Sequence, residues 1–231
     1  MTNIIAIIPS RSGSKSIKNK NLQKINGKSL LQRSIEFAAS IKRITKIVVS
    51  TDSSYYQKLA IKYGADCPFL RPKKLANDLS HDIDVFYHCL NWLKKNENYN
   101  SDIVINLRPT YPFRKKKDFE FAIDKILNNP YIDSVKSVCK IPFPLDKTWT
   151  IKKNKFLKNT IHKKPKKEFW NFPRQQLESY YVQNGNIDII KSSLIFKKLM
   201  SGKKIYPIIQ NHFFDIDSYK DVKQARKFKS F

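Results

Sequence analysis

Two groups of residues in this sequence have the types and spacing that phosphate chemistry requires. The first is a polar loop at residues 9–21, which follows a run of apolar residues. The loop combines Gly13 and several serines with four cations, Arg11, Lys15, Lys18 and Lys20. Because side-chain cations and backbone N–H groups bind phosphate together, we interpret the loop as an anion site for a triphosphate. It contains neither the Walker pattern nor the dinucleotide pattern G-x-G-x-x-G, and a solvated basic loop is the alternative interpretation.

The second group is a pair of acids near the end of the chain, Asp215 and Asp217, on either side of Ile216. Alternate residues of a strand point to opposite faces, so we expect both carboxylates on one face at a strand end. Mg²⁺ prefers a carboxylate or two together with substrate phosphate oxygens and water. The pair is therefore a candidate site for Mg²⁺ or Mn²⁺. The alternative is that Asp217 or Ser218 only caps the helix that follows.

Cysteine and histidine show no comparable pattern. Cys67, Cys89 and Cys139 are odd in number and widely spaced, which argues against a disulfide framework and against a zinc site. We expect all three to pack as buried or half-buried thiols. The histidines lack the spacing of metal ligands, so we assign them no chemistry.

Alternating strand and helix patterns surround these residues. Apolar runs predict strands, the last at a sheet edge, at residues 4–8, 44–50, 103–107, 134–138, 186–190 and 204–209. Apolar residues at helical spacing predict helices at residues 30–41, 56–63, 85–93, 119–127, 195–199 and 219–228. This order predicts an α/β fold with a mainly parallel sheet and helices on both faces. Ligands bind such sheets at the carboxyl ends of the strands, where the loop at 9–21 lies.

Further polar residues are expected near the same edge of the sheet. Ser53 follows the second predicted strand, although it equally suits a helix N-cap. Asp78 and Ser80 lie before the third predicted helix and are candidate ligand contacts or parts of a capped turn. Arg108 begins a loop with two prolines, which exclude regular structure and leave its polar side chains displayed. A capping residue at Ser80 or Asp82 is expected to start the third helix.

The net charge of +26 and the pI near 9.9 are typical of nucleic-acid-binding proteins. Here, however, lysines are spread over every segment, with local clusters only at 114–117 and 162–167. We therefore interpret most of the charge as a solvated surface, part of which attracts anionic ligands. No apolar run approaches the roughly 20 residues that span a bilayer, and the chain start has no signal-peptide layout. A single cytoplasmic domain without membrane contact is the expectation.

The segment from Pro142 to Tyr180 differs from the rest of the chain. It is polar, aromatic and rich in lysine and proline, without a clear sheet period. We interpret it as an insertion rather than as an independently folding domain. Its aromatic residues, Trp149, Phe169, Trp170 and Phe172, suit a protein interface, where aromatics are enriched. A disordered basic arm is the alternative.

The sequence resembles the acylneuraminate cytidylyltransferases, which make CMP-sialic acid and related CMP-nonulosonates. The resemblance begins with IIPSRSGSKSIKNKN at residues 7–21. Seven shorter matches follow in family order: STDS at 50–53, YGA at 63–65, FLRPKKLANDLS at 69–80, LRPTYPFR at 107–114, PRQQ at 173–176, QNG at 183–185 and DIDSYKD at 215–221. The resemblance therefore covers the whole chain.

The resemblance implies a Rossmann-like nucleotidyltransferase that joins CMP from CTP to a nine-carbon sugar acid and releases diphosphate. It implies a catalytic role for Arg11, Lys20 and Asp217. It places the nucleotide against Arg11, Ser12, Gly13, Lys15, Lys20, Asn21, Asp78 and Ser80. It places the sugar against Arg108, Thr110, Arg174, Gln175 and Asn184, and it assigns the metal to Asp215 and Asp217. The insertion, at about residues 142–182, would form a homodimer contact and contribute to the neighbouring subunit's sugar site.

Several alternatives stay open at this point. Many relatives have Gln where this chain has Arg108, which leaves the identity of the sugar open; a guanidinium would hold a carboxylate in bidentate fashion. The acid would belong to the neuraminate, legionaminate or pseudaminate type. A CMP-Kdo synthetase is less favoured, because the RLPGKPL motif typical of those enzymes is absent. A basic nucleic-acid-binding protein is the alternative from another class, but no RNA- or DNA-binding module is recognisable.

Overall fold

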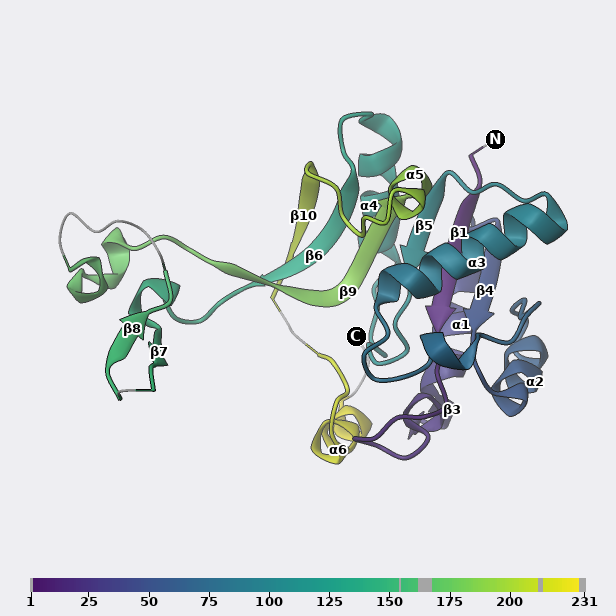
Figure 1. Ribbon diagram of the computed structural model, residues 1–231, viewed down its shortest axis with the longest axis horizontal. Helices are drawn as coiled ribbons and strands as arrows, with labels where there is room; N and C mark the ends of the chain where they lie inside the picture. Colours follow the sequence, from purple (N-terminus) through teal and green to yellow (C-terminus); the bar gives the residue numbers. More distant parts are fainter. Residues whose placement is uncertain (1, 154, 162–167, 212–213, 229–231) are drawn as a thin grey trace.

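The protein is built around one six-stranded sheet, which the computed structural model in Figure 1 shows near its centre. The structure describes residues 2–153, 155–161, 168–211 and 214–228. The strand order is β10-β6-β9-β5-β1-β4. The strands are β1 (Ile4–Pro9), β4 (Lys46–Ser50), β5 (Ile103–Asn106), β6 (Ser134–Lys140), β9 (Tyr181–Lys191) and β10 (Ile205–Gln210).

The sheet is mainly parallel, as predicted. Strand β1 lies parallel to both β4 and β5, and β10 lies parallel to β6. Strand β9 is the exception, because it runs antiparallel to β5 and β6 and joins the two parallel parts. The polar loop that follows β1 therefore emerges at the carboxyl ends of the parallel strands, where open α/β sheets bind ligands.

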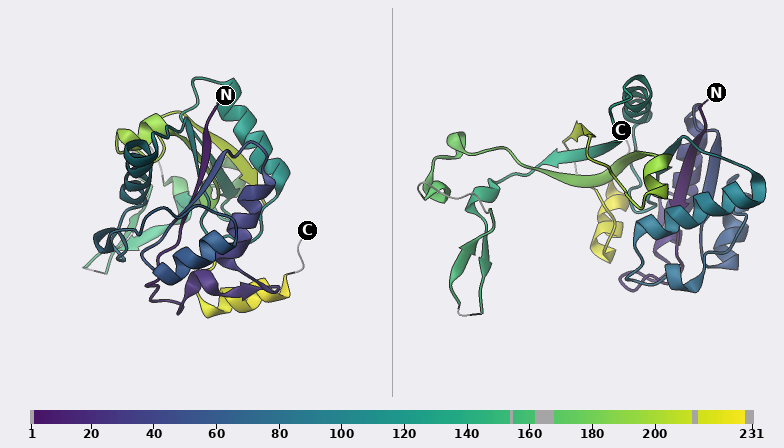
Figure 2. Two further views of the ribbon diagram at one scale, coloured as in Figure 1. Left: turned by 90° about the vertical axis from the view of Figure 1, so that its right-hand side faces the viewer. Right: turned by 45° about the horizontal axis from the view of Figure 1, so that its top comes forward.

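Helices cover both faces of the sheet, which confirms the predicted fold class (Figure 2). The helices are α1 (Leu30–Ser40), α2 (Ser54–Lys62), α3 (Asp82–Glu97), α4 (Lys116–Asn128), α5 (Ser192–Phe196) and α6 (Tyr219–Lys227). Apolar residues of α1 and α4 pack in the core on one face, and those of α3 and α5 pack on the other. Burial of these helix stripes supplies the main driving force that holds the layers together.

Serine side chains cap the first two helices, and the cap at Ser53 was predicted. Ser29 caps α1 through a hydrogen bond from Gln32 N, and Ser53 caps α2 through one from Tyr56 N. At α3 the prediction of a cap at Ser80 or Asp82 is wrong, because His81 occupies the N-cap position and makes no side-chain cap bond. The Ser80 hydroxyl instead accepts from Asn77 N, within the loop before the helix.

Strands β6 and β9 continue beyond the body of the molecule and carry the predicted insertion between them (Figure 1). The expected strands at 134–138 and 186–190 are both longer than predicted, because residues 181–183 pair with 138–140 across a bulge. Beyond them lies a short antiparallel hairpin that was not predicted, β7 (Trp149–Ile151) with β8 (Leu157–Asn159). We call residues 141–180 the arm; the basic cluster at 162–167 lies outside the described residues.

Short elements complete the chain. They are η1 (Lys20–Leu22), β2 (Lys24–Ile25), β3 (Lys28–Ser29), η2 (Lys73–Leu75), η3 (Leu145–Lys147), η4 (Phe169–Asn171) and η5 (Arg174–Gln176). The three cysteines are buried thiols that form no disulfide, as expected. In the described part of the chain no helix has the length and apolar character needed to cross a membrane.

Candidate active site

The polar loop after β1 is held in place by the strand next to it. Ser10 N donates to Ser50 O of β4 at 2.9 Å. Both the backbone N–H and the hydroxyl of Ser12 donate to the carboxylate of Asp52, each at 2.8 Å. Ser12 therefore anchors the loop, and its hydroxyl is already engaged with Asp52. The predicted contact of Ser12 with nucleotide remains a prediction.

A cavity of about 270 Å³ lies between this loop, the residues before α3 and the loop that follows β5. Seven of the predicted site residues line it: Arg11, Lys20, Asn21, Asp78, Ser80, Arg108 and Thr110. They come from three separate stretches of sequence, and the fold brings them together at the carboxyl ends of β1 and β5. The cavity is polar and holds three cationic predicted residues, so it suits a negatively charged ligand.

Asp78 bridges two of the loop cations. Its carboxylate accepts from Arg11 Nη2 at 2.7 Å and from Lys15 Nζ at 2.7 Å. The hydrogen bond from Lys15, and then that from Arg11, holds the pKa of the Asp78 carboxyl below its ordinary value. Lys15 lies outside the main cavity but lines an adjoining hollow beside Asp78. The Asp78 carboxylate thus pairs with Arg11 and Lys15, two of the cations that were predicted to bind phosphate.

Lys20 connects the polar loop to the acidic pair near the chain end. Its Nζ lies 2.9 Å from Asp217 Oδ1, and the Lys20 side chain is largely buried while that of Asp217 is exposed. Asn21 is buried and donates to Arg11 O at 3.1 Å, which holds the two halves of the loop together. Gly13 does not line the cavity, and a Cβ added there would meet open space.

The acidic pair does not lie on a strand end, contrary to the prediction. Strand β10 ends at Gln210, and Asp215 and Asp217 lie in the irregular segment before α6. Buried Ile216 anchors this segment, and its N–H donates to Thr110 O at 2.9 Å. Ser218, rather than Asp217, caps α6 through a capping box with Asp221. The capping alternative is thus satisfied by Ser218 and leaves the Asp217 carboxylate free of that role.

The acidic pair has the donor chemistry that a hard divalent cation needs. Asp215 Oδ1 is buried and has no hydrogen-bond partner among the described residues, an arrangement that is costly without a ligand. Asp217 contributes a second carboxylate on the other side of Ile216. In the described residues no group of three or more His, Cys, Asp or Glu side chains is placed to hold a metal. Two carboxylates completed by substrate phosphate and water nonetheless fit Mg²⁺.

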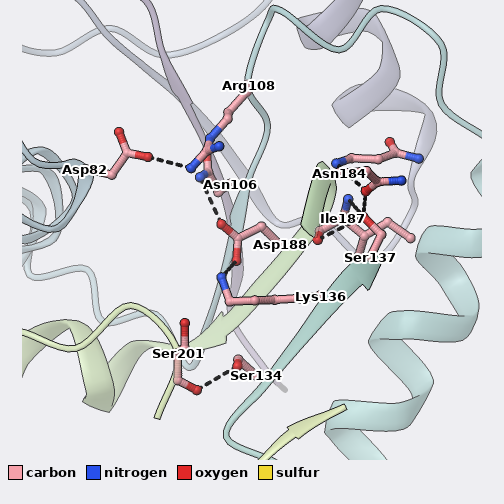
Figure 3. A network of polar contacts seen from close by, with 11 residues as sticks. Asp82, Asn106, Arg108, Ser134, Lys136, Ser137, Asn184, Ile187, Asp188 and Ser201 are labelled. Carbon is pink, nitrogen blue, oxygen red and sulfur yellow. Dashed lines mark hydrogen bonds and ion pairs between the residues drawn. The ribbon is translucent and has the colours of Figure 1, made fainter. Parts of the chain in front are cut away.

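The loop after β5 carries Arg108 into a network of polar contacts (Figure 3). Arg108 Nη2 donates to Asp82 Oδ2 at 2.8 Å, at the start of α3. Beside it, buried Lys136 and Asp188 form an ion pair at 2.6 Å, and Asn106 Nδ2 donates to Asp188 at 3.1 Å. This network ties the carboxyl end of β5 to β6 and β9. Arg108 is therefore positioned on a rigid support.

Asn184 does not reach the cavity. Its side chain is buried in the sheet, where Nδ2 donates to Gln210 Oε1 at 2.9 Å and Oδ1 accepts from the Ser137 hydroxyl. The neighbouring Gly185 approaches Arg108, because an added Cβ would lie 3.6 Å from Arg108 Nη1. Gly185 of the QNG motif therefore lies beside the Arg108 side chain. The prediction that Asn184 binds sugar remains untested.

Arg174 and Gln175 lie on the arm in η5, not at the cavity. Arg174 Nη2 donates to Pro142 O at 2.9 Å, which ties the returning strand of the arm to its outgoing strand. Figure 1 shows the arm projecting away from the body that holds the cavity. Within one chain these two residues are therefore separated from the other predicted sugar contacts.

Sequence reasoning did not assign to the site several residues that line the cavity, among them Ser14, Arg71 and Asn77. Arg71 is buried, and its Nε donates to Ser50 Oγ at 3.1 Å. Burial lowers the pKa of the Arg71 guanidinium to about 10. The prolines around Arg71 indicated an extended segment, but the sequence did not indicate that this segment reaches the cavity. Bridges from 48 to 66 and from 51 to 70 bring it there.

The chain matches the family model described as cytidylyltransferase over residues 5–229. It is 30% identical over 229 residues to the post-translational flagellin modification protein B of Campylobacter coli, covering 96% of this chain and 93% of that protein. It is 31% identical over 228 residues to a CMP-N,N'-diacetyllegionaminic acid synthase of Campylobacter jejuni, with 96% and 93% covered.

A solved structure of CMP:2-keto-3-deoxy-manno-octonic acid synthetase complexed with CTP is similar in fold. It superposes with a TM-score of 0.69 at 16% sequence identity and covers 97% of both chains. At that identity the likeness concerns the fold alone. The match to the family model, which spans almost the whole chain, confirms the resemblance noted from the motifs: the chain belongs to the cytidylyltransferase family and is a nucleotidyltransferase enzyme.

Proposed function

We propose that this protein activates a nonulosonic acid, a nine-carbon keto-sugar acid, by transfer of CMP from CTP with release of diphosphate. The observation that carries the proposal is the convergence of Arg11, Lys20, Asn21 and Arg108 on one cavity in a chain of the cytidylyltransferase family. The similarity to a CMP-N,N'-diacetyllegionaminic acid synthase supports the substrate class. The anomeric C2 hydroxyl of the acid attacks the α-phosphorus of CTP, and the bond to diphosphate breaks.

The cations of the polar loop bind and neutralise the triphosphate in this proposal. Nucleotidyl transfer needs little covalent chemistry from the protein, and positioning and charge neutralisation do most of the work. Arg11 and Lys15 already hold one anion, the Asp78 carboxylate, so they are arranged to hold another. The triphosphate would replace Asp78 on these two cations. Lys20, largely buried, would neutralise charge that grows on the leaving diphosphate.

Asp215 and Asp217 would hold the divalent cation, Mg²⁺ or Mn²⁺. The buried, unpartnered Oδ1 of Asp215 supports this assignment. When bound, the cation would neutralise phosphate charge and make the sugar hydroxyl more acidic, so no separate general base is required. Asp217 is paired with Lys20 in this structure. With both ligands bound, Asp217 would contact the metal and Lys20 would contact the triphosphate.

Arg108 and Thr110 would bind the sugar acid from the loop after β5. Arg108 is half-exposed at the cavity and pairs with Asp82 through one guanidinium nitrogen. A guanidinium that retains free N–H groups suits the carboxylate of a sugar acid. Behind it, Asp188 of β9 pairs with Lys136 of β6 and accepts from Asn106 at the end of β5, which holds the start of this loop against β9. These contacts favour a negatively charged sugar over a neutral one.

A second copy of the chain would complete the sugar site through the arm. Several apolar residues of the arm are exposed in one chain, including Ile151 at 77% and Phe156 at 70%. Trp149 packs against Trp170 with ring centroids 5.2 Å apart, which gives the arm a small aromatic cluster of its own. Aromatic residues are enriched in protein interfaces. Arg174 and Gln175 would reach the partner's cavity in such a homodimer. The reaction itself would take place in the cytoplasm.

The test is release of diphosphate from each of the four nucleoside triphosphates, with Mg²⁺ and a panel of acids. The panel contains neuraminic, legionaminic and pseudaminic acid derivatives and the eight-carbon acid Kdo, and each component is omitted in turn. We expect release only with CTP, the cation and a nine-carbon acid. Release with Kdo and with none of the nine-carbon acids would show that the proposed sugar class is wrong. No release with any acid, together with RNA binding at physiological salt, would favour the nucleic-acid alternative.

A further inference from the structure

A second cavity, of about 550 Å³, lies behind the loop that follows β5. It is formed by α1, the β2–β3 turn and the start of α4, and it shares no lining residue with the candidate active site. Pro109 and Thr110 line the active-site cavity, while Pro112 and Phe113 line this one. The two cavities therefore contact different residues of the same loop.

The lining of this cavity is strongly cationic. It contains five cations and one acid, namely Lys28, Arg33, Arg114, Lys115, Lys116 and Glu36. Glu36 accepts from Lys28 Nζ at 2.7 Å, so its charge is already balanced. Lys116 lies 3.7 Å from Glu120, and with Arg33, Arg114 and Lys115 the lining still holds more cations than acids, so an anion would be attracted to the cavity.

The two arginines of this cavity lack acidic partners. Arg33 donates to two backbone carbonyls, Pro112 O at 3.4 Å and Ile25 O at 3.3 Å. Arg114 Nη2 donates to Arg108 O at 2.5 Å, while its Nε is buried without a hydrogen-bond partner. In the part of the chain that the structure describes, neither guanidinium forms an ion pair.

The charge of Arg114 is held in an unfavourable environment. Burial lowers the pKa of its guanidinium to about 9, and the nearby Tyr111 and Asp215 offset this only in part. A charge that is removed from water without a bonded counterion is costly to the folded state. The cost would fall if a bound anion supplied the missing negative charge.

We propose that this cavity is a second binding site for a small phosphate-bearing anion. Phosphate carries more than one charge and accepts several hydrogen bonds, so it can engage both guanidiniums and a lysine at once, which a single carboxylate does less well. Lys115 and Lys116 stand at the N-terminal end of α4, whose N-cap makes no side-chain hydrogen bond. The first backbone N–H groups of this 13-residue helix also favour a negative charge at its N-terminal end.

Equilibrium dialysis with radiolabelled diphosphate at physiological ionic strength tests this site. We expect the wild-type chain to bind two equivalents. Arg11→Ala should remove the equivalent at the candidate active site, and Arg33→Gln should weaken the other by about 10-fold or more, because hydrogen bonds between charged groups are strong. Arg43→Gln is the matched control, since Arg43 is an exposed arginine that pairs with Asp124 outside the cavity.

The sites can be judged separately because each has its own variant. Lys116→Gln, a change at an exposed helix start, serves as a second test if Arg33→Gln lowers the melting temperature. A single equivalent that Arg11→Ala abolishes would overturn the proposal, as would a second equivalent that survives both Arg33→Gln and Lys116→Gln. Loss on Arg33→Gln but not on Arg11→Ala would support the second site and count against the proposed function. If inorganic phosphate displaces the labelled diphosphate, the site binds free phosphate. If only CMP displaces it, the site binds a nucleotide.

Discussion

The body of the molecule and its arm are built on opposite principles. In the body, β1 and β5 are buried on both faces, and the polar loops at their ends are held by hydrogen bonds such as those from Ser12 to Asp52. In the arm, the hairpin strands are too short to bury their own apolar residues, and Ile151 and Leu157 are exposed. A short hairpin without a covered face contributes little stability by itself.

This difference indicates which half of the reaction one chain can support. The predicted triphosphate and metal residues are already close to one another in a single chain, as the Lys20–Asp217 contact demonstrates. Two of the predicted sugar residues, Arg174 and Gln175, lie on the arm, away from that cavity. One chain therefore provides the predicted nucleotide end of the site, while the predicted sugar end depends on what the arm contacts.

The largest effect should come from the acidic pair in the body. Asp215→Ala or Asp217→Ala should lower turnover about 10²-fold or more, as loss of a principal electrostatic group does. Steady-state rates with CTP, Mg²⁺ and the accepted acid measure this effect. Asp124→Ala is the matched control, because Asp124 is an exposed acid of α4 outside both cavities. Turnover near the wild-type level in both variants would refute the metal assignment.

The arm should show the next largest effect, and this prediction tests the comparison directly. Ile151→Lys combined with Phe156→Lys should convert a dimer into a monomer and lower kcat/KM for the acid about 10-fold or more, as loss of central interface residues does. Light scattering and kinetics measure the two outcomes. Ile61→Lys changes an exposed aliphatic residue of the body and should alter neither. A wild-type monomer with full activity would contradict the role of the arm.

Asp78→Asn should have a smaller effect, in the opposite direction. The Asp78 carboxylate occupies Arg11 and Lys15, so its neutralisation should tighten CTP binding by about 2- to 5-fold, a size typical of an exposed ion pair. Titration calorimetry at low and at physiological salt would reveal the change. Asp84→Asn, at an exposed acid that pairs with Lys198, is the control. Weaker CTP binding would instead support the direct nucleotide contact predicted from the sequence.

The smallest effects concern the thiols of the body. Burial raises the pKa of Cys67 to about 11 and that of Cys89 further. A raised folded-state pKa favours the folded protein below the unfolded thiol pKa of about 8.5, and this contribution is lost as the pH rises toward the folded value. Stability should therefore decrease above about pH 8.5 in denaturant titrations. Rapid alkylation of Cys67 in the native protein at neutral pH would contradict the burial argument.

Sequence patterns predicted the layers of the fold more accurately than the geometry of the site. Strand periodicity located the sheet because burial on both faces leaves an uninterrupted apolar run, as in β1. The same rule could not show that Asp215 and Asp217 lie off a strand, because that depends on Ile216 docking against Thr110, a contact between distant residues.

Residue types alone also could not show whether a polar side chain supports the fold or contacts a ligand. Asn184 was predicted to bind sugar, which remains untested, and the structure shows that its amide contacts Gln210 inside the sheet. Arg71 was not singled out, although the parallel bridge beside it brings it to the cavity. Both outcomes depend on which strands become neighbours, and local periodicity carries no information about that order.

The central claim concerns which phosphorus is attacked, and radiolabelled CTP tests it most directly. The protein is incubated with Mg²⁺, the accepted nine-carbon acid and CTP labelled at either the α- or the γ-phosphate, and the products are separated. We predict that the α-label appears in a CMP-sugar and the γ-label in diphosphate. Transfer of the γ-label to the sugar, or no labelled sugar from either form of CTP, would contradict the proposed reaction.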